Sequence, residues 1–231
     1  MANEFELDGV VPWGREADEY EAFFELDDVP ASARVLDCGG GPASFTAEWC
    51  ARGRRVTAAD PLYRFDTASI RARFDATREP MRLGMERAHA QFRWDFYDSE
   101  DAVVVRRARA LERFAADRAS HPGRYVAAAL PLLPFADQCF ELVLCSHFLF
   151  LYSAELSADF HVAALREMLR VGCEVRVFPL LDLDGAPSAH LEPALAALAA
   201  EATAERVPVP FEFRRGSRHL LRLTSARGAP G

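Results

Sequence analysis

Three consecutive glycines follow an acidic residue and a cysteine at the end of an apolar run, in the segment VLDCGGGPASF. Glycine tolerates positive φ angles and exposes bare backbone, so Gly39, Gly40 and Gly41 can form a tight turn against which a ligand lies. A helix is expected to begin at Pro42, which would add the unpaired N–H groups of its first turn. The spacing is typical of the GxGxxG nucleotide-binding loop, with Ser44 at the third small position.

A second acidic residue, Asp60, follows about 20 positions after Gly39, at the end of the next β-rich run. An acid at this distance, at the carboxyl end of a strand, can accept hydrogen bonds from both ribose hydroxyls of an adenosine. The alternative interpretation is a plain glycine turn with a capping aspartate. Both features occur in the strand context that binding requires, so the sequence favours a ligand that contains adenosine.

The charge of Asp37 distinguishes between adenosine ligands. A carboxylate just before the glycines would repel the pyrophosphate of a dinucleotide, whereas it would attract the ammonium and sulfonium groups of S-adenosylmethionine (SAM). The sequence also contains no lysine, which excludes mechanisms that need a catalytic lysine. We therefore expect SAM rather than a nicotinamide dinucleotide.

Strands that alternate with helices must position these acids. Helix-like segments separate most of the β-rich runs, which predicts a βαβ series with a parallel sheet. A helix with Ser157 as its cap is expected to reach Arg170. The expected strands of the parallel series are residues 34–38, 55–59, 124–129, 140–145 and 173–180.

The C-terminal part of the chain predicts a different arrangement. Alanine is enriched in residues 191–204, which suits a helix. Valine and phenylalanine then alternate through residues 207–213, where Pro208 and Pro210 cannot donate ladder hydrogen bonds. We expect this strand at a sheet edge, paired antiparallel with a last strand at residues 219–224.

The connection between the second and third strands, residues 64–124, is far longer than one helix needs. Its pattern predicts helices at residues 67–78, 81–92 and 99–119, and arginines outnumber acidic residues. We interpret it as a helical insertion. It could form a lid that builds a pocket for an anionic acceptor, or its last helix could use its apolar stripe as a homodimer contact.

Four segments together resemble successive motifs of the class I SAM-dependent methyltransferases: DCGGGP, AADP, LPFADQCFELVLCSHFLFLY and LREMLRV. The resemblance covers residues 34–60 and 124–224. It implies an α/β fold with a doubly wound, mostly parallel seven-stranded sheet that ends in an antiparallel hairpin. Residues 1–231 would form a single domain, interrupted by the insertion at residues 64–124.

The resemblance also implies a cofactor site. Asp37 and the glycine turn would surround the methionine part of SAM, Asp60 would bind the ribose, and Leu62 or Tyr63 would cover the adenine. Many family members carry an acidic or amide residue after the third strand to bind the adenine, but this chain reads AAALPLLPF there, which leaves the backbone for that contact. Further expected cofactor-binding residues are Pro61, Ser146 and Arg15, the last either paired with the methionine carboxylate or solvated.

The candidates for the chemistry follow the fourth strand. His147 is placed at the carboxyl edge of the sheet, where it could serve as the general base or could support the loop by hydrogen bonding. Phe148 and Tyr152 could wall an acceptor pocket or belong to the core. Trp94, in the insertion, could face the substrate or seat the insertion on the sheet.

The composition narrows the class of protein. The 231 residues carry a formal net charge of −8, which makes a nucleic acid a poor partner. The five cysteines form no CxxC pair, so we expect neither a metal site nor disulfides, and a cytoplasmic location. The N-terminal residues lack the apolar core of a signal peptide, and no stretch is apolar enough to span a membrane.

Together these observations predict an enzyme that transfers a methyl group from SAM to a small or medium-sized acceptor of unknown identity, releasing S-adenosylhomocysteine (SAH). Two alternatives remain at this point. The chain could bind SAM or SAH without turnover, or it could be a nicotinamide-dependent oxidoreductase on a similar sheet.

Overall fold

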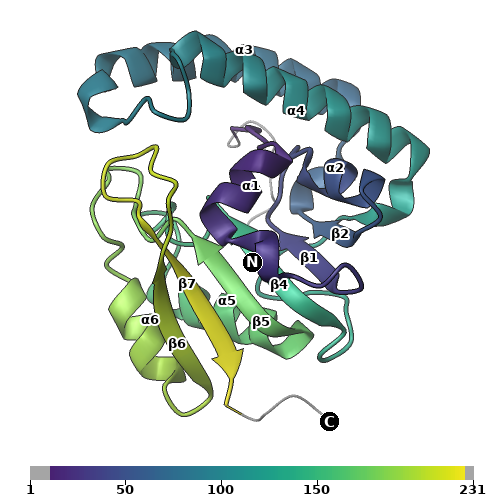
Figure 1. The fold of residues 1–231 in the computed structure, drawn as a ribbon, viewed down its shortest axis with the longest axis vertical. Coiled ribbons are helices and arrows are strands. Elements are labelled where there is room, and N and C mark those ends of the chain that lie inside the picture. Colours follow the sequence, from purple (N-terminus) through teal and green to yellow (C-terminus); the bar gives the residue numbers. More distant parts are fainter. Residues whose placement is uncertain (1–10, 227–231) are drawn as a thin grey trace.

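The computed structural model describes residues 11–226. Its centre is a seven-stranded sheet with the strand order β3-β2-β1-β4-β5-β7-β6 (Figure 1). Neighbouring strands from β3 to β5 are parallel, whereas β7 is antiparallel to both β5 and β6. This arrangement confirms the class I methyltransferase fold. The strands are β1 (Arg34–Cys38), β2 (Arg55–Ala59), β3 (Tyr125–Val126), β4 (Phe140–Ser146), β5 (Gly172–Phe178), β6 (Ala202–Pro208) and β7 (His219–Ser225).

The helices occupy the connections between strands. Ser157 caps α5 as predicted, since its side chain accepts a hydrogen bond from the Phe160 N–H. The α-helices are α1 (Ala17–Phe24), α2 (Phe45–Ala51), α3 (Thr67–Arg87), α4 (Glu100–Ser120), α5 (Ala158–Val171) and α6 (Leu191–Leu198). Short 3₁₀ turns are η2 (Leu26–Asp28), η3 (Pro61–Arg64), η4 (His89–Gln91) and η5 (Pro122–Arg124).

Several predicted element bounds were wrong. The helix α2 begins at Phe45, because Pro42 belongs to the glycine turn. The third strand has only two residues. The helices expected at residues 67–78 and 81–92 are replaced by the single helix α3, which continues through Pro80. A proline inside a helix costs about 3 kcal/mol, and burial of Met85 on the far side of Pro80 offsets part of that cost.

The C-terminal hairpin is antiparallel and β6 lies at the sheet edge, as predicted. The position of the strand was wrong, however: β6 ends at Pro208, and its first residues come from the alanine-rich stretch that was expected to be helical. Ala202 pairs with Ser225, and the ladder that begins there overrides the helix propensity of alanine.

Alternate residues of the central strands build two cores, one on each face of the sheet. Leu36 of β1 and Val143 of β4 face α5 and α6 in one core. Val35 and Leu142 face the other core, which contains α1 and α2. A third cluster joins the insertion to the end of β2, with members that include Leu62, Tyr63, Ile70, Phe74, Leu111 and Phe114.

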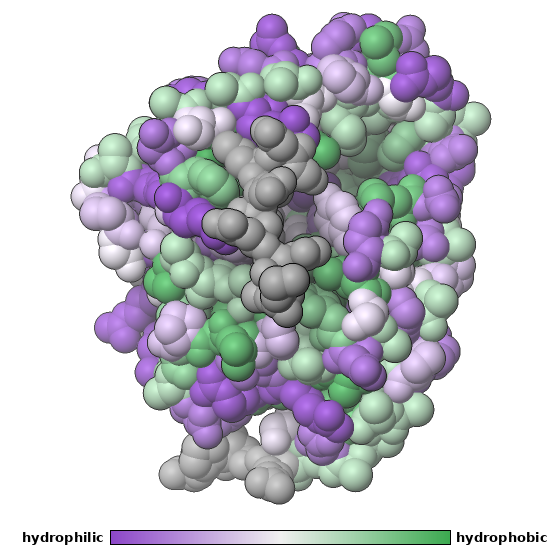
Figure 2. Space-filling view, turned by 180° about the vertical axis from the view of Figure 1, so that it is seen from behind, coloured by the Kyte–Doolittle hydropathy of each residue, from purple (hydrophilic) through white to green (hydrophobic). Residues whose placement is uncertain are grey.

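The insertion runs along one side of the molecule, where α3 and α4 lie next to each other above α1 (Figure 1). Leu111 and Ala115, from the predicted apolar stripe of α4, are buried within the chain. On the face shown in Figure 2, hydrophilic and hydrophobic residues are interspersed. Among residues 11–226, no helix combines the length and the apolar character needed to cross a membrane.

Candidate functional site

The glycine turn connects β1 to α2 at the carboxyl edge of the sheet. Gly39 and Gly41 have φ angles of +73° and +54°, the left-handed region that glycine adopts without strain. A Cβ atom at Gly40 would lie 2.2 Å from Oδ2 of Asp37, so the turn folds over that carboxylate. A Cβ atom at Gly41 would meet no other heavy atom of the described residues within 4 Å. The turn therefore has one face against Asp37 and one open face.

Asp60 ties the end of β2 to this turn. Its Oδ2 accepts a hydrogen bond from the Gly41 N–H at 2.8 Å, and its Oδ1 accepts one from the Leu62 N–H at 2.7 Å. The Tyr63 hydroxyl donates to the Gly41 carbonyl oxygen at 2.7 Å. Burial raises the pKa of Asp60 to about 6, although the two N–H donors oppose that shift. A carboxylate offers about four acceptor positions, so two remain for a ligand's hydroxyls.

Asp37 lies beneath the turn with 1% of its surface exposed. The Tyr20 hydroxyl lies 3.1 Å from its Oδ1 and 3.3 Å from its Oδ2, and donates to this carboxylate. Burial raises the pKa of Asp37 to about 7, and the charge of Asp60 adds to that effect. Tyr20 is not among the site residues predicted from the sequence. Its signal was weak: one hydroxyl among the aromatic residues of α1, in the run EYEAFF.

His147 follows β4 directly and has a φ angle of +51°, which is uncommon for a residue with a Cβ atom. Its backbone N–H donates to the Phe178 carbonyl oxygen at 2.6 Å. Its Nδ1 lies 2.9 Å from the Ser146 hydroxyl, and its ring contacts the rings of Phe23 and Phe178. Burial, together with the charge of Arg15, lowers the pKa of His147 well below its usual value, so the imidazole is neutral.

The segment before α1 passes directly over the glycine turn. A Cβ atom at Gly14 would lie 2.0 Å from the Pro42 carbonyl oxygen, and the Ser44 N–H donates to the Arg15 carbonyl oxygen at 3.0 Å. The Arg15 guanidinium donates to the Trp13 carbonyl oxygen at 3.3 Å. Within residues 11–226 it forms no ion pair, and burial lowers its pKa to about 10. A partly buried cation is thus available beside the turn.

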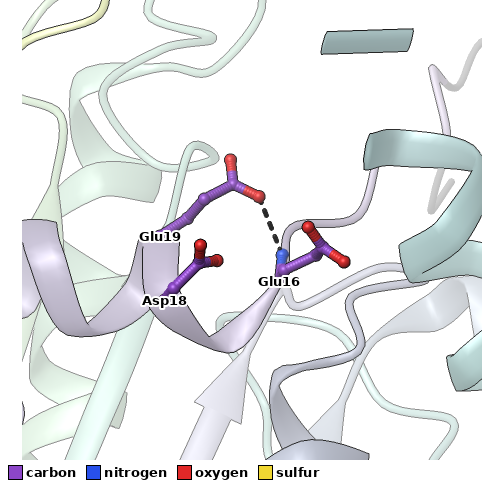
Figure 3. A group of neighbouring side chains, drawn as sticks. All are labelled: Glu16, Asp18 and Glu19. Carbon is purple, nitrogen blue, oxygen red and sulfur yellow. Dashed lines mark hydrogen bonds between the residues drawn. The ribbon is translucent and has the colours of Figure 1, made fainter. Parts of the chain in front are cut away.

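Three carboxylates at the start of α1, from Glu16, Asp18 and Glu19, lie within 4.8 Å of one another (Figure 3). Arginines of α4 neutralise them: Arg107 Nη1 lies 2.7 Å from Glu19 Oε1, and Arg113 Nη1 lies 2.9 Å from Glu16 Oε1. Further partners of the three acids are Arg106, Arg109 and Tyr97. The group therefore anchors the insertion to α1, which in turn carries Tyr20.

The structure brings most of the predicted site residues together at the carboxyl ends of β1, β2 and β4. The Phe148 ring packs on the turn, 3.3 Å from where a Gly39 Cβ would lie, and Tyr152 lies next to it. The side chains of Leu62 and Tyr63 are buried in the third cluster, behind the turn that Pro61 begins. The residues that meet here are Arg15, Asp37, Gly39, Gly40, Gly41, Asp60, Pro61, Leu62, Tyr63, Ser146, His147, Phe148 and Tyr152.

Trp94 lies elsewhere. Its ring contacts His89, Phe92 and Phe213. These contacts involve the segment that joins α3 to α4, residues 88–99, which we call the foot of the insertion. Beside this foot is a groove of about 420 Å³, which Arg93, Phe96, Phe211, Glu212 and Arg218 help to line. One layer of aromatic rings separates the groove from His147, because Phe211 and His147 both pack against Phe23 and Phe178.

The chain has a relative of similar length among known proteins. No protein-family model matches the sequence. The uncharacterized protein MJ0045 of Methanocaldococcus jannaschii is 30% identical over 219 residues, which cover 93% of this chain and 96% of that relative.

Among solved structures, the PH0226 protein of Pyrococcus horikoshii OT3 is similar with a TM-score of 0.50 and 12% identity, over 90% of each chain. The magnesium protoporphyrin IX methyltransferase of Synechocystis PCC 6803, crystallised with SAH, has a TM-score of 0.48 and 11% identity, over 90% of this chain and 81% of that one. The chain belongs to the same family as the protein MJ0045 of M. jannaschii, and it has the class I methyltransferase fold.

Proposed function

We propose that the protein is a methyltransferase that binds SAM across the carboxyl ends of β1, β2 and β4. In open α/β sheets, ligands bind where the strand order reverses, which here is between β1 and β4. The observation that carries the proposal is the Asp60 carboxylate, held by the Gly41 and Leu62 N–H groups at the open face of the glycine turn. This geometry suits the two hydroxyls of a ribose.

The charges at the site suit the rest of SAM. The carboxylate of Asp37 would attract the ammonium and sulfonium groups. The Arg15 guanidinium, which has no ion pair within residues 11–226, would pair with the methionine carboxylate. The turn of Pro61, Leu62 and Tyr63 would lie beside the adenine, with its backbone as the contact. SAM contributes the methyl group on a sulfonium, and the protein supplies its position.

Methyl transfer is an in-line displacement, so holding the acceptor in line with the methyl group supplies much of the rate. An acceptor that must lose a proton needs a base, and we assign that role to His147, which is neutral and lies beside the turn. Phe148 and Tyr152 would wall the acceptor, and Trp94 would meet only the far end of a longer one. The acceptor is proposed to be a small or medium-sized molecule.

We propose that the insertion, residues 64–124, covers the site from the acceptor side. Its α4 holds α1 over the glycine turn through the Arg107–Glu19 ion pair. Its foot packs on the loop after β6, where the Arg93 N–H donates to the Phe213 carbonyl oxygen at 2.7 Å. A cover of this kind would exclude water from the sulfonium.

Calorimetry with SAM, SAH and NAD tests the cofactor assignment. The wild-type protein is expected to bind SAM and SAH but not NAD. Asp60→Ala should weaken SAM binding by about 10- to 150-fold, the loss of roughly 1.5–3 kcal/mol for hydrogen bonds to a charged group. The matched control is Asp75→Ala, an exposed carboxylate on α3, which should leave the affinity unchanged. A folded Asp60→Ala protein with wild-type affinity would refute the ribose assignment.

Turnover separates an enzyme from a protein that only binds SAM. Candidate acceptors are screened for release of SAH, with the Asp60→Ala protein as the blank. Tight binding of SAM without SAH release from any acceptor class would favour the non-catalytic alternative. Binding of NAD in preference to SAM would favour the oxidoreductase.

A further inference from the structure

The groove beside the foot of the insertion can hold a small molecule. Its volume of about 420 Å³ lies within the range that small-molecule sites occupy. The foot contributes Arg93 and Phe96 to the lining, and the loop after β6 contributes Phe211 and Glu212. Two kinds of side chain therefore meet in one groove: aromatic rings and charged groups.

The Glu212 carboxylate holds two arginines at the wall of the groove. Its Oε2 accepts hydrogen bonds from Arg93 Nη1 at 3.1 Å and from Arg218 Nε at 2.7 Å. Its Oε1 accepts one from the Gly216 N–H at 2.8 Å. The Glu212 side chain is 9% exposed, so three donors already occupy an acid that is largely withdrawn from water. Glu212 fixes both guanidinium groups but offers one negative charge to their two positive charges.

Arg218 keeps unused donors in the groove. Its Nε is bonded to Glu212, whereas its two terminal nitrogens have no partner among residues 11–226. The side chain is 58% exposed, and it lines the groove. Guanidinium N–H groups only donate, and their planar arrangement matches the oxygens of a carboxylate. An oxyanion in the groove would therefore find a partner that no other group has taken.

Asp95 is the acid with which such an anion must compete. Its Oδ2 accepts a hydrogen bond from Arg93 Nε at 2.8 Å and lies 2.6 Å from Arg93 Nη2. The Asp95 side chain is 72% exposed, and exposed ion pairs are weak because water screens them. A ligand carboxylate can thus replace Asp95 as the partner of Arg93 at little cost.

The aromatic part of the groove suits a ring. Phe96 and Phe211 pack edge to face, with ring centroids 5.0 Å apart and ring planes at 74°. Phe211 is 5% exposed, whereas Phe96 is only half-buried. A flat ring laid against Phe96 would bury apolar surface on both partners.

We propose that this groove is a ligand site of its own, which takes a small aromatic molecule that carries a carboxylate or a similar oxyanion. The oxyanion binds Arg218 and Arg93, and the ring packs against Phe96. The inference does not depend on the proposed function, because a layer of aromatic rings separates the groove from His147.

Calorimetry with 2-naphthoate tests this inference, with neutral 2-naphthamide and cationic 2-naphthylmethylammonium as matched probes. The wild-type protein should bind the naphthoate most tightly. Arg218→Gln should weaken naphthoate binding by about 10-fold or more, because it removes charge-assisted hydrogen bonds, and should affect naphthamide much less. Asp95→Asn should strengthen naphthoate binding by about 2- to 5-fold, because Arg93 loses its competing partner.

Two further variants serve as controls. Arg206→Gln removes an exposed arginine of β6 that pairs with Glu192 and does not line the groove, so naphthoate binding should not change. Phe96→Leu should weaken naphthoate and naphthamide alike, since both rings lose the same aromatic surface. Circular dichroism establishes that each variant is folded.

The inference would be overturned by absence of naphthoate binding at millimolar concentration, or by equal or tighter binding of either matched probe. Unchanged naphthoate affinity in folded Arg218→Gln would also overturn it. All of these titrations are done without SAM. A protein that fails to bind SAM would refute the proposed function and leave the naphthoate result intact, whereas SAM binding without naphthoate binding would refute only the groove.

Discussion

Asp37 and Asp60 are buried carboxyls whose ionised forms lower the free energy of unfolding. Both carboxyls are withdrawn from water, and burial raises their pKa values to about 7 and about 6. Because the Asp37 carboxyl has an ordinary value of 3.8, the folded protein between pH 4 and 7 holds a proton that the unfolded chain has released. The free energy of unfolding should therefore fall as the pH rises through this window.

Replacing Asp37 with asparagine tests this at the scale of one residue. Asp37→Asn removes the group's contribution, so the unfolding free energies of variant and wild type should diverge by about 1.4 kcal/mol per pH unit inside the window. Denaturant titrations at pH 5, 6, 7 and 8 measure the difference, which should level off above pH 7. The contribution of Asp60 is common to both proteins. Parallel curves across the window would show that Asp37 is already ionised at pH 5.

At the scale of elements, α4 is anchored to α1 by ion pairs, although it contributes no residue to the glycine turn. Arg107, 2% exposed, pairs with Glu19, which is fully buried, and burial of the two charges is costly unless they remain together. Arg107→Met should lower the free energy of unfolding by about 3–5 kcal/mol, because it leaves Glu19 buried without its main counter-charge.

An exposed ion pair that also involves α4 provides the control. Arg71 of α3 and Glu112 of α4 form an exposed ion pair at 2.7 Å, so Arg71→Met should cost less than about 1 kcal/mol. The double variant Arg107→Met, Glu19→Gln should recover part of the loss, since no unpaired charge remains. Denaturant unfolding measures all three. Equal losses for Arg107→Met and Arg71→Met would mean that the buried pair does not anchor α4 to α1.

At the scale of the whole molecule, the proposed cofactor site and the C-terminal hairpin lie at different parts of one sheet. Hydrogen exchange with and without SAH should therefore respond locally. Protection is expected in residues 13–20, 38–44 and 60–63, which surround the turn, because a ligand that binds only the folded form suppresses local opening. The amides of β6 and β7 should change little. Protection centred on the hairpin would place the ligand elsewhere.

The sequence by itself determined the sheet and the identity of the turn. Local patterns carry this information: β1 and β2 were predicted at their observed bounds, and Gly39, Gly41 and Asp60 meet as their spacing indicated. The motif resemblance extended this to the seven-stranded fold with its antiparallel hairpin. These features depend on neighbours in the chain or on strand order, which a sequence displays directly.

Only the tertiary structure decided the partners of these residues. Tyr20 meets Asp37 and Glu19 meets Arg107 across long stretches of chain, and no local pattern records such pairings. The same reason explains the wrong boundaries, since packing carried α3 through Pro80 and strand pairing drew Ala202 into β6 against its helix propensity. Contacts distant in sequence outweighed local preference at each of these positions, because burial and pairing supply more free energy than propensity does.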